Sequence, residues 1–128
     1  MRRSDFLVVV LWTMTVGTAA LAEPISVRHI QRPMHRFMVA RSEDGKTIAS
    51  GEFSQDVQGD EVKMRLTYRF LDRSIDDETT TYRQQGTFRL IRDHHIQKGP
   101  FFAKPIDLTK EAATGIVSNR TIEKNGTI

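Results

Sequence analysis

The chain contains no cysteine among its 128 residues. This absence excludes a disulfide scaffold, a thiol nucleophile, thiolate zinc sites, iron–sulfur clusters and a lipid-modified cysteine at a processed N-terminus. Glycine and proline are also scarce, with eight and four residues, and the glycines stand singly rather than in a phosphate-binding loop. The nucleophile motifs G-x-S-x-G and S-x-x-K are missing. We therefore expect a protein that is not an enzyme and that has no cofactor.

The first 22 residues have the three parts of a secretory signal peptide. Arg2 and Arg3 supply the positive start, residues 6–16 form a short apolar stretch, and Ala20-Leu21-Ala22 fits the cleavage pattern. The apolar stretch is shorter than the roughly 20 residues of a transmembrane helix, so an uncleaved anchor is the less favoured alternative. We expect cleavage before Glu23, which leaves 106 residues and no transmembrane span.

Charge and cysteine content suggest a location and exclude one class of partner. The leader carries two arginines and one aspartate, so the net charge of +3 becomes +2 after its removal. A nucleic-acid-binding protein would show a clustered basic patch, and this weak charge does not favour one. An exported protein without cysteine is unusual among animal extracellular proteins and ordinary in a bacterial periplasm. The expectation is an exported protein, periplasmic or secreted, with no nucleic-acid partner.

Strict alternation of apolar and polar residues dominates the middle of the chain. Apolar residues occupy every second position here: Val62, Met64, Leu66, Tyr68 and Phe70. The intervening residues are charged or polar, which is typical of a half-buried strand and not of a helix. We therefore expect residues 62–70 to form a strand whose apolar face belongs to the core.

Short polar turns separate this strand from further β-like segments. Asp44-Gly45 is a strong hairpin signal. Residues 72–77 are expected to form another turn, in which the acids at 76–78 would be solvated. The predicted strands are 35–41, 46–55, 62–70, 78–84, 87–97, 106–109 and 116–123. Successive strands with short turns predict an all-β fold, an antiparallel meander that forms an open half-barrel or one sheet of a sandwich. Residues 23–128 would be a single domain.

The end of the chain predicts an incomplete domain. Asn125-Gly126 is a preferred two-residue hairpin turn, but only Thr127 and Ile128 follow it. A fragment that lacks closing strands would leave residues 116–123 as an unpaired edge, through which the protein could self-associate. The alternative is a frayed terminus of a complete chain.

Four residues are candidates for ligand binding. If strand 87–97 keeps its register, Arg92 and His94 share a face with Phe88 and Leu90, and this cationic pair could hold an acidic head group at the mouth of an apolar cavity. Two alternatives remain: a bulge at Ile91 that reverses the register, or a strand that runs into solvent. Phe101 and Phe102 follow in a loop bounded by Gly and Pro. They could cap a cavity or touch a lipid, or they could cover the open end of a core.

The histidines do not predict a metal site. His94 and His95 are adjacent and point to opposite faces of a strand, while Asp93 and His95 share one. Two ligands fall short of the three that a catalytic zinc site usually takes, so we expect no bound metal. A hydrolase built on Asp93, His94 and His95 is the least favoured function.

The leader, the long alternating strands and the segments GTFRLIRDHHIQKGPFFAKPIDLT and EAATGIV resemble those of exported bacterial β-rich proteins of unknown function. The resemblance covers about residues 34–128 and implies further strands beyond EAATGIV, but no activity and no functional residue. Two hypotheses for the function remain, and the single strongly apolar face together with the absence of catalytic motifs favours the first. The first is a non-catalytic binding or carrier module for a lipid or another apolar or amphipathic ligand. The second is a structural or interaction module of the cell envelope that pairs through a sheet edge.

Overall fold

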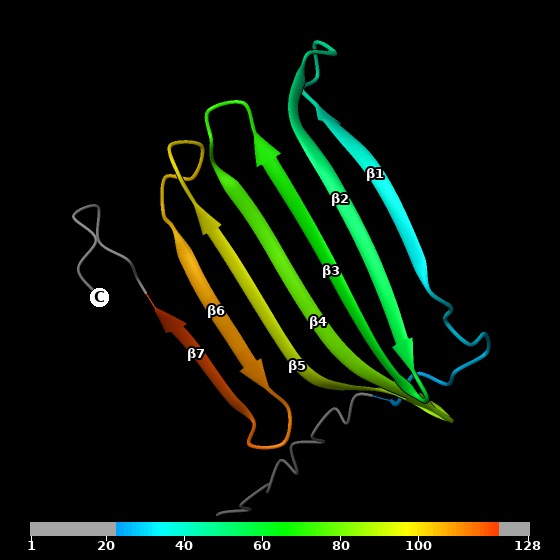
Figure 1. Ribbon diagram of the computed structural model, residues 1–128. Coiled ribbons are helices and arrows are strands. Elements are labelled where there is room, and N and C mark those ends of the chain that lie inside the picture. Colours follow the sequence, from blue (N-terminus) through cyan, green and yellow to red (C-terminus); the bar gives the residue numbers. More distant parts are fainter. Residues whose placement is uncertain (1–22, 121–128) are drawn as a thin grey trace, which may run out of the picture.

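Seven strands form one open antiparallel sheet in the computed structural model, which describes residues 23–120 (Figure 1). The strands are β1 (Met34–Arg41), β2 (Thr47–Gln58), β3 (Glu61–Phe70), β4 (Ile75–Gln85), β5 (Thr87–Lys98), β6 (Ile106–Glu111) and β7 (Ile116–Arg120). They lie side by side in chain order, so the predicted all-β meander is confirmed. The predicted leader at 1–22 and the turn at 125–126 fall outside the described residues. Residues 23–120 include no helix that could cross a membrane.

The pairing register separates the side chains into two faces, because directly opposed residues of antiparallel strands share a face. We call the face that carries Val62, Met64, Leu66, Tyr68 and Phe70 the inner face, and the opposite one the outer face. The inner face continues onto β2 through pairs such as Phe53 with Leu66 and onto β4 through Tyr82 with Val62.

Burial is concentrated on the inner face but remains shallow. Ala49 and Val62 are the two buried apolar residues of the described chain, both fully inaccessible to solvent. Leu66 and Tyr68, which were expected in the core, are half-buried. Three polar residues of the inner face are also buried: Gln55, Gln84 and Asp93. Side chains of the inner face therefore shield one another more than those of the outer face, as expected for a sheet that curls toward it. No second sheet covers them within residues 23–120.

Gly51 of β2 allows Tyr68 of β3 to contact β1. A Cβ atom on Gly51 would lie 2.5 Å from Cε1 of Tyr68, so the aromatic ring occupies the space directly above the glycine. The Tyr68 hydroxyl then reaches across β2 to the Met38 sulfur at 3.8 Å. The missing side chain at 51 therefore lets an aromatic ring of β3 lie against β2 and contact β1.

Residues 23–33, which we call the strap, link β5 to β1 across one end of the sheet. The strap begins beside β5, where Phe88 N donates to Ile25 O at 2.9 Å and Val27 N donates to Gly86 O at 2.9 Å. It then runs past the lower ends of the strands to the start of β1 (Figure 1). Because β6 pairs with β5 from Arg92 onward, the strap uses a stretch of the β5 edge that β6 leaves free.

Two buried glutamines of the inner face hold the second half of the strap. The Gln84 side chain accepts a hydrogen bond from Gln31 N at 2.6 Å and donates one to Gln31 O at 3.1 Å. Gln55 donates from Nε2 to Arg32 O at 2.6 Å. These side chains point inward and bind strap backbone, so the strap crosses the inner side of the sheet and closes one end of it.

Replacing Gln84 by alanine should loosen the strap. The variant loses two hydrogen bonds to Gln31, each worth about 1 kcal/mol, so the strap should open more often. Trypsin should then cleave after Arg28 several-fold faster than in the parent protein, as followed by mass spectrometry. Gln97→Ala is the matched control, because Gln97 bonds Asp76 and not the strap. Equal cleavage of both variants would show that Gln84 does not restrain this segment.

Candidate functional site

The inner face combines an apolar half with a charged strip. Its large apolar side chains on β1–β3 that are half-buried or exposed are Met34, Met38, Phe53, Val57, Met64, Leu66, Tyr68 and Phe70. The exposed Arg36 of β1 lies among them, opposite Phe53. The charged side chains, which we call the charged cluster, are Asp76, Glu78, Asp93, His95 and Lys110 on β4–β6. Beyond this cluster, Ile106 and Leu108 of β6 continue the inner face. An amphipathic surface therefore lies uncovered within the described residues.

An aromatic group closes the end of the inner face opposite the strap. Phe101 stacks on Phe70 with ring centroids 4.2 Å apart, and Phe102 meets Phe70 edge-on at 5.4 Å. The loop is anchored by Phe101 N, which donates to the buried Ser74 hydroxyl at 2.8 Å. This approach requires Gly99, whose φ is +107° and where a Cβ would lie 2.6 Å from Cα of Ser74. Phe101 and Phe102 therefore cover one end of the apolar half, as one of the predicted alternatives states.

The charged cluster contains two hydrogen-bonded groups. Asp76 accepts from Nε2 of Gln97 at 3.1 Å and contacts Nε2 of His95 at 2.6 Å. Asp93 accepts from the Thr80 hydroxyl and from Lys110 Nζ, both at 2.8 Å. Every buried side-chain nitrogen and oxygen of the described residues has a partner. Asp76 and Asp93 are thus each paired within the cluster.

Asp93 is held in its charged form. Burial alone would raise the pKa of Asp93, but the hydrogen bonds from Lys110 and Thr80 outweigh it and lower that pKa below its usual value. The same contact raises the pKa of Lys110, first through its hydrogen bond to Asp93 and then through charge attraction, with a smaller attraction to Glu78. This ion pair therefore persists at neutral pH on the inner face.

A bulge places Arg92 and His94 on the outer face. Thr81 pairs with Arg92 while the next residue, Tyr82, pairs with Leu90, so Ile91 is an extra residue in β5. The register therefore reverses at this point: Phe88 and Leu90 point inward, and Arg92 and His94 point outward. The Ile91 carbonyl accepts a hydrogen bond from Ala112 N at 3.0 Å. The structure therefore agrees with the predicted alternative of a bulge at Ile91.

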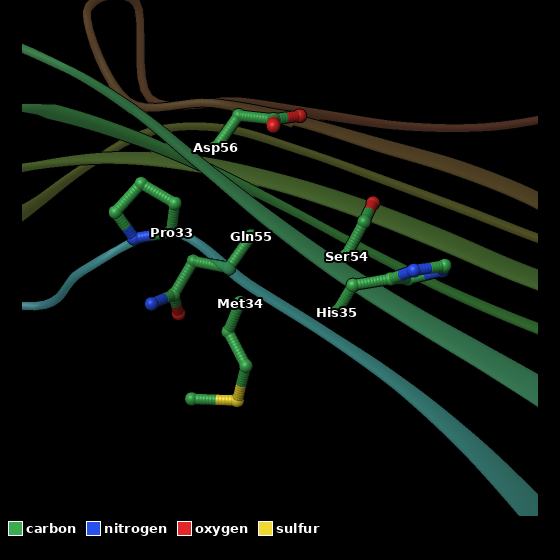
Figure 2. Close-up of a pocket in the computed structure, with 6 residues that line it drawn as sticks. All are labelled: Pro33, Met34, His35, Ser54, Gln55 and Asp56. Carbon is green, nitrogen blue, oxygen red and sulfur yellow. The ribbon is translucent and has the colours of Figure 1, made fainter.

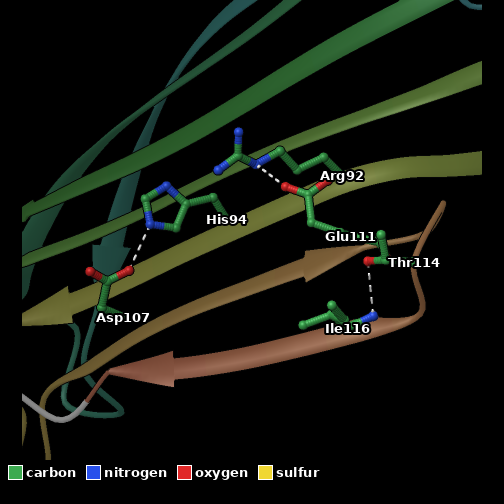
Figure 3. A network of polar contacts seen from close by, with 6 residues as sticks. All are labelled: Arg92, His94, Asp107, Glu111, Thr114 and Ile116. Carbon is green, nitrogen blue, oxygen red and sulfur yellow. Dashed lines mark hydrogen bonds and ion pairs between the residues drawn. The ribbon is translucent and has the colours of Figure 1, made fainter.

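On the outer face, Arg92 and His94 are each paired with an acid of β6. Arg92 Nε lies 2.9 Å from Glu111 Oε1, and His94 Nε2 lies 2.7 Å from Asp107 Oδ1 (Figure 3). These residues line an open hollow of about 380 Å³. The predicted head-group site at Arg92 and His94 stays a prediction, but both side chains already contact a carboxylate. The four sequence candidates are thus divided, with the phenylalanines at the inner face and the cationic pair on the outer one.

The structure also separates the residues of the least favoured hypothesis. Asp93 and His95 share the inner face, as predicted, whereas His94 lies on the outer face, so the three side chains do not converge. The expected turn at 72–77 is wrong in its second half, because β4 begins at Ile75. Asp76 and Glu78 are consequently part of the inner face and not of a solvated turn. Residues 23–120 hold no group of three or more His, Asp or Glu side chains suited to a metal ion.

Comparison with known proteins identified no relative. No protein-family model matches the chain, and neither the curated proteins nor the solved structures contain a match. The resemblance to exported bacterial β-rich proteins therefore stays a prediction.

Proposed function

We propose that the protein is a non-catalytic, exported binding or carrier module that holds an apolar or amphipathic ligand, such as a lipid, on its inner face. The observation that carries the proposal is the uncovered apolar half of that face. Six large apolar side chains of β2 and β3 remain only half-buried there: Phe53, Val57, Met64, Leu66, Tyr68 and Phe70. An apolar surface rimmed by polar groups is typical of a binding site.

The boundaries of the face support a ligand of limited size. The strap crosses one end and the cluster of Phe70, Phe101 and Phe102 covers the other. Between them the apolar side chains lie beside the charged cluster, which offers an ammonium donor at Lys110 and carboxylate acceptors at Asp76 and Glu78. An alkyl chain would lie along β2 and β3, and a polar head group would meet β4 and β5.

Binding of a neutral apolar fluorophore tests this proposal directly. The full chain should bind N-phenyl-1-naphthylamine with a rise in its fluorescence. Leu66→Lys, which introduces a charge at the centre of the apolar half, should weaken the affinity about tenfold. Extraction of the protein from its native host with organic solvent, followed by mass spectrometry, should recover a lipid.

Val39→Lys is the matched control for the fluorophore experiment. Val39 is an exposed valine of the outer face, with 57% of its surface accessible, so this variant should bind like the parent. Circular dichroism of both variants verifies that the sheet is intact. Equal loss of binding in the two variants, or a parent protein that binds no fluorophore and yields no lipid, would contradict a ligand site on the inner face.

A further inference from the structure

The outer edge of β1 is an unpaired edge of the sheet. β1 stands at one end of the strand order, and within the described residues β2 is its one neighbour. In an antiparallel pair alternate residues direct their backbone groups toward the neighbour, so about half of the eight residues of β1 present N–H and C=O groups that no strand of residues 23–120 satisfies, over a length of about 26 Å. Two apolar side chains of the outer face flank this edge, Phe37 with 77% and Val39 with 57% of the surface exposed. Such an edge is a template for a further strand.

The same region is strongly basic. Residues 24–42 contain four arginines and two histidines but no aspartate or glutamate. Two of the arginines, Arg36 and Arg41, lie on β1 itself, and Arg28 and Arg32 lie on the strap that leads into it. No ion pair within residues 23–120 joins any of these arginines to a carboxylate. The four arginines are therefore unpaired within the described part of the chain, whereas His35 of β1 contacts Glu52 at 2.8 Å.

These two properties select among possible partners. A lipid surface could attract the arginines, but it cannot satisfy the open backbone groups of a strand. A second copy of this chain, paired edge to edge through β1, would bring the arginines of both copies together, and like charges on neighbouring strands repel. An extended segment rich in Asp or Glu satisfies both the hydrogen bonds and the charge.

We propose that β1 binds an extended acidic segment of a partner protein, which adds to the sheet as an eighth strand beside Met34–Arg41. This site borders the proposed ligand site, because Arg36 lies on the inner face opposite Phe53. An open hollow of about 470 Å³ at the start of β1 and near the end of β2 gives the partner strand room at its end. Figure 2 shows Met34 and Gln55 on one side of this strand pair, and His35, Ser54 and Asp56 on the other. Carboxylates of the partner strand would meet Arg36 on one face and Arg41 beyond it.

A pair of synthetic peptides tests the proposal. A fluorescently labelled eight-residue peptide of alternating Glu and Val should bind the full chain in an anisotropy titration, whereas the corresponding Lys–Val peptide should not. The double variant Arg36→Glu/Arg41→Glu should lose at least about tenfold in affinity for the Glu–Val peptide and gain affinity for the Lys–Val peptide. Binding should slow amide hydrogen exchange in β1 and leave β7 unchanged.

Lys63→Glu/Arg69→Glu is the matched control, because both side chains are exposed cations of the outer face on β3 and the net charge changes equally. This variant should retain the preference for the Glu–Val peptide. Equal weakening in the two double variants would show that overall charge, and not β1, attracts the peptide. Failure of the Glu–Val peptide to bind, protection outside β1, or binding to phosphatidylglycerol vesicles without peptide binding would each overturn the proposal. Because Arg36 shares the inner face with Phe53, the ligand site is tested separately through Leu66→Lys, which leaves both arginines in place.

Discussion

Replacing Val62 by aspartate should lower the free energy of unfolding by about 3–5 kcal/mol, enough to unfold a marginally stable sheet. Val62 is fully buried on the inner face, where it pairs with Val57 of β2 and Tyr82 of β4. A carboxylate at this position would have no cation opposite it and no access to water. Urea titration followed by circular dichroism measures the loss.

Val117→Asp provides the comparison for this variant. Val117 also faces inward, but it lies on β7 and 64% of its surface is exposed, so the same chemical change should cost less than about 0.5 kcal/mol. Similar losses at both positions would mean that the shielding at Val62 is not what stabilises the sheet.

Asp93→Asn should be the most destabilising change in the charged cluster, by about 2–3 kcal/mol at neutral pH. The asparagine retains the volume but loses the charged hydrogen bond from Lys110 on a side chain that is almost inaccessible to solvent. Because the pKa of Asp93 is lowered in the folded protein, the parent is stabilised by this carboxylate above its unfolded pKa. That stability is lost as the pH falls below about 4 through the folded pKa.

The measurement is the free energy of unfolding at pH 7 and pH 3. The parent should lose more stability on acidification than Asp93→Asn does. Some acid sensitivity should remain in the variant because of Asp77. Burial raises the pKa of Asp77, but the hydrogen bonds from Thr67 and Arg65 outweigh burial, so the pKa of Asp77 is lowered like that of Asp93. Asp56→Asn, at an exposed position of β2, should behave like the parent. An unchanged pH dependence in Asp93→Asn would assign the acid sensitivity to other carboxylates.

The sequence predicts the strands of this protein well because their signals are local. The alternation over residues 62–70 and the turn at Asp44-Gly45 give β1, β2 and β3 to within a few residues. The inner-face cluster could not be predicted in the same way. Its members come from three strands, and their meeting depends on the register of β4 against β5. The extra residue at Ile91 changes that register, and the sequence alone could only give this bulge as one of several alternatives.

Two further residues show where local patterns give too little information. Asp76 and Glu78 look like part of a solvated acidic run, yet they alternate in phase with Thr80 and Tyr82, which share their face. That phase was the available signal for an inward position. The two glutamines that hold the strap carry no comparable signal, since Gln55 and Gln84 bind backbone that is distant in the chain.

The strand order has a consequence for how the molecule gains and loses structure. Within residues 23–120 every strand pairs with its sequence neighbours alone, and the longer connections are the strap, the contact of Tyr68 with Met38 and the loop that seats Phe101 on Phe70. Such a chain behaves as a linear array, in which each hairpin contributes separately to the free energy of folding. Folding can then spread from any hairpin to the next. Pairings this local shorten the search for the native state relative to other all-β topologies. Fraying then proceeds inward from β7, and the hairpins around β3 are the last to open.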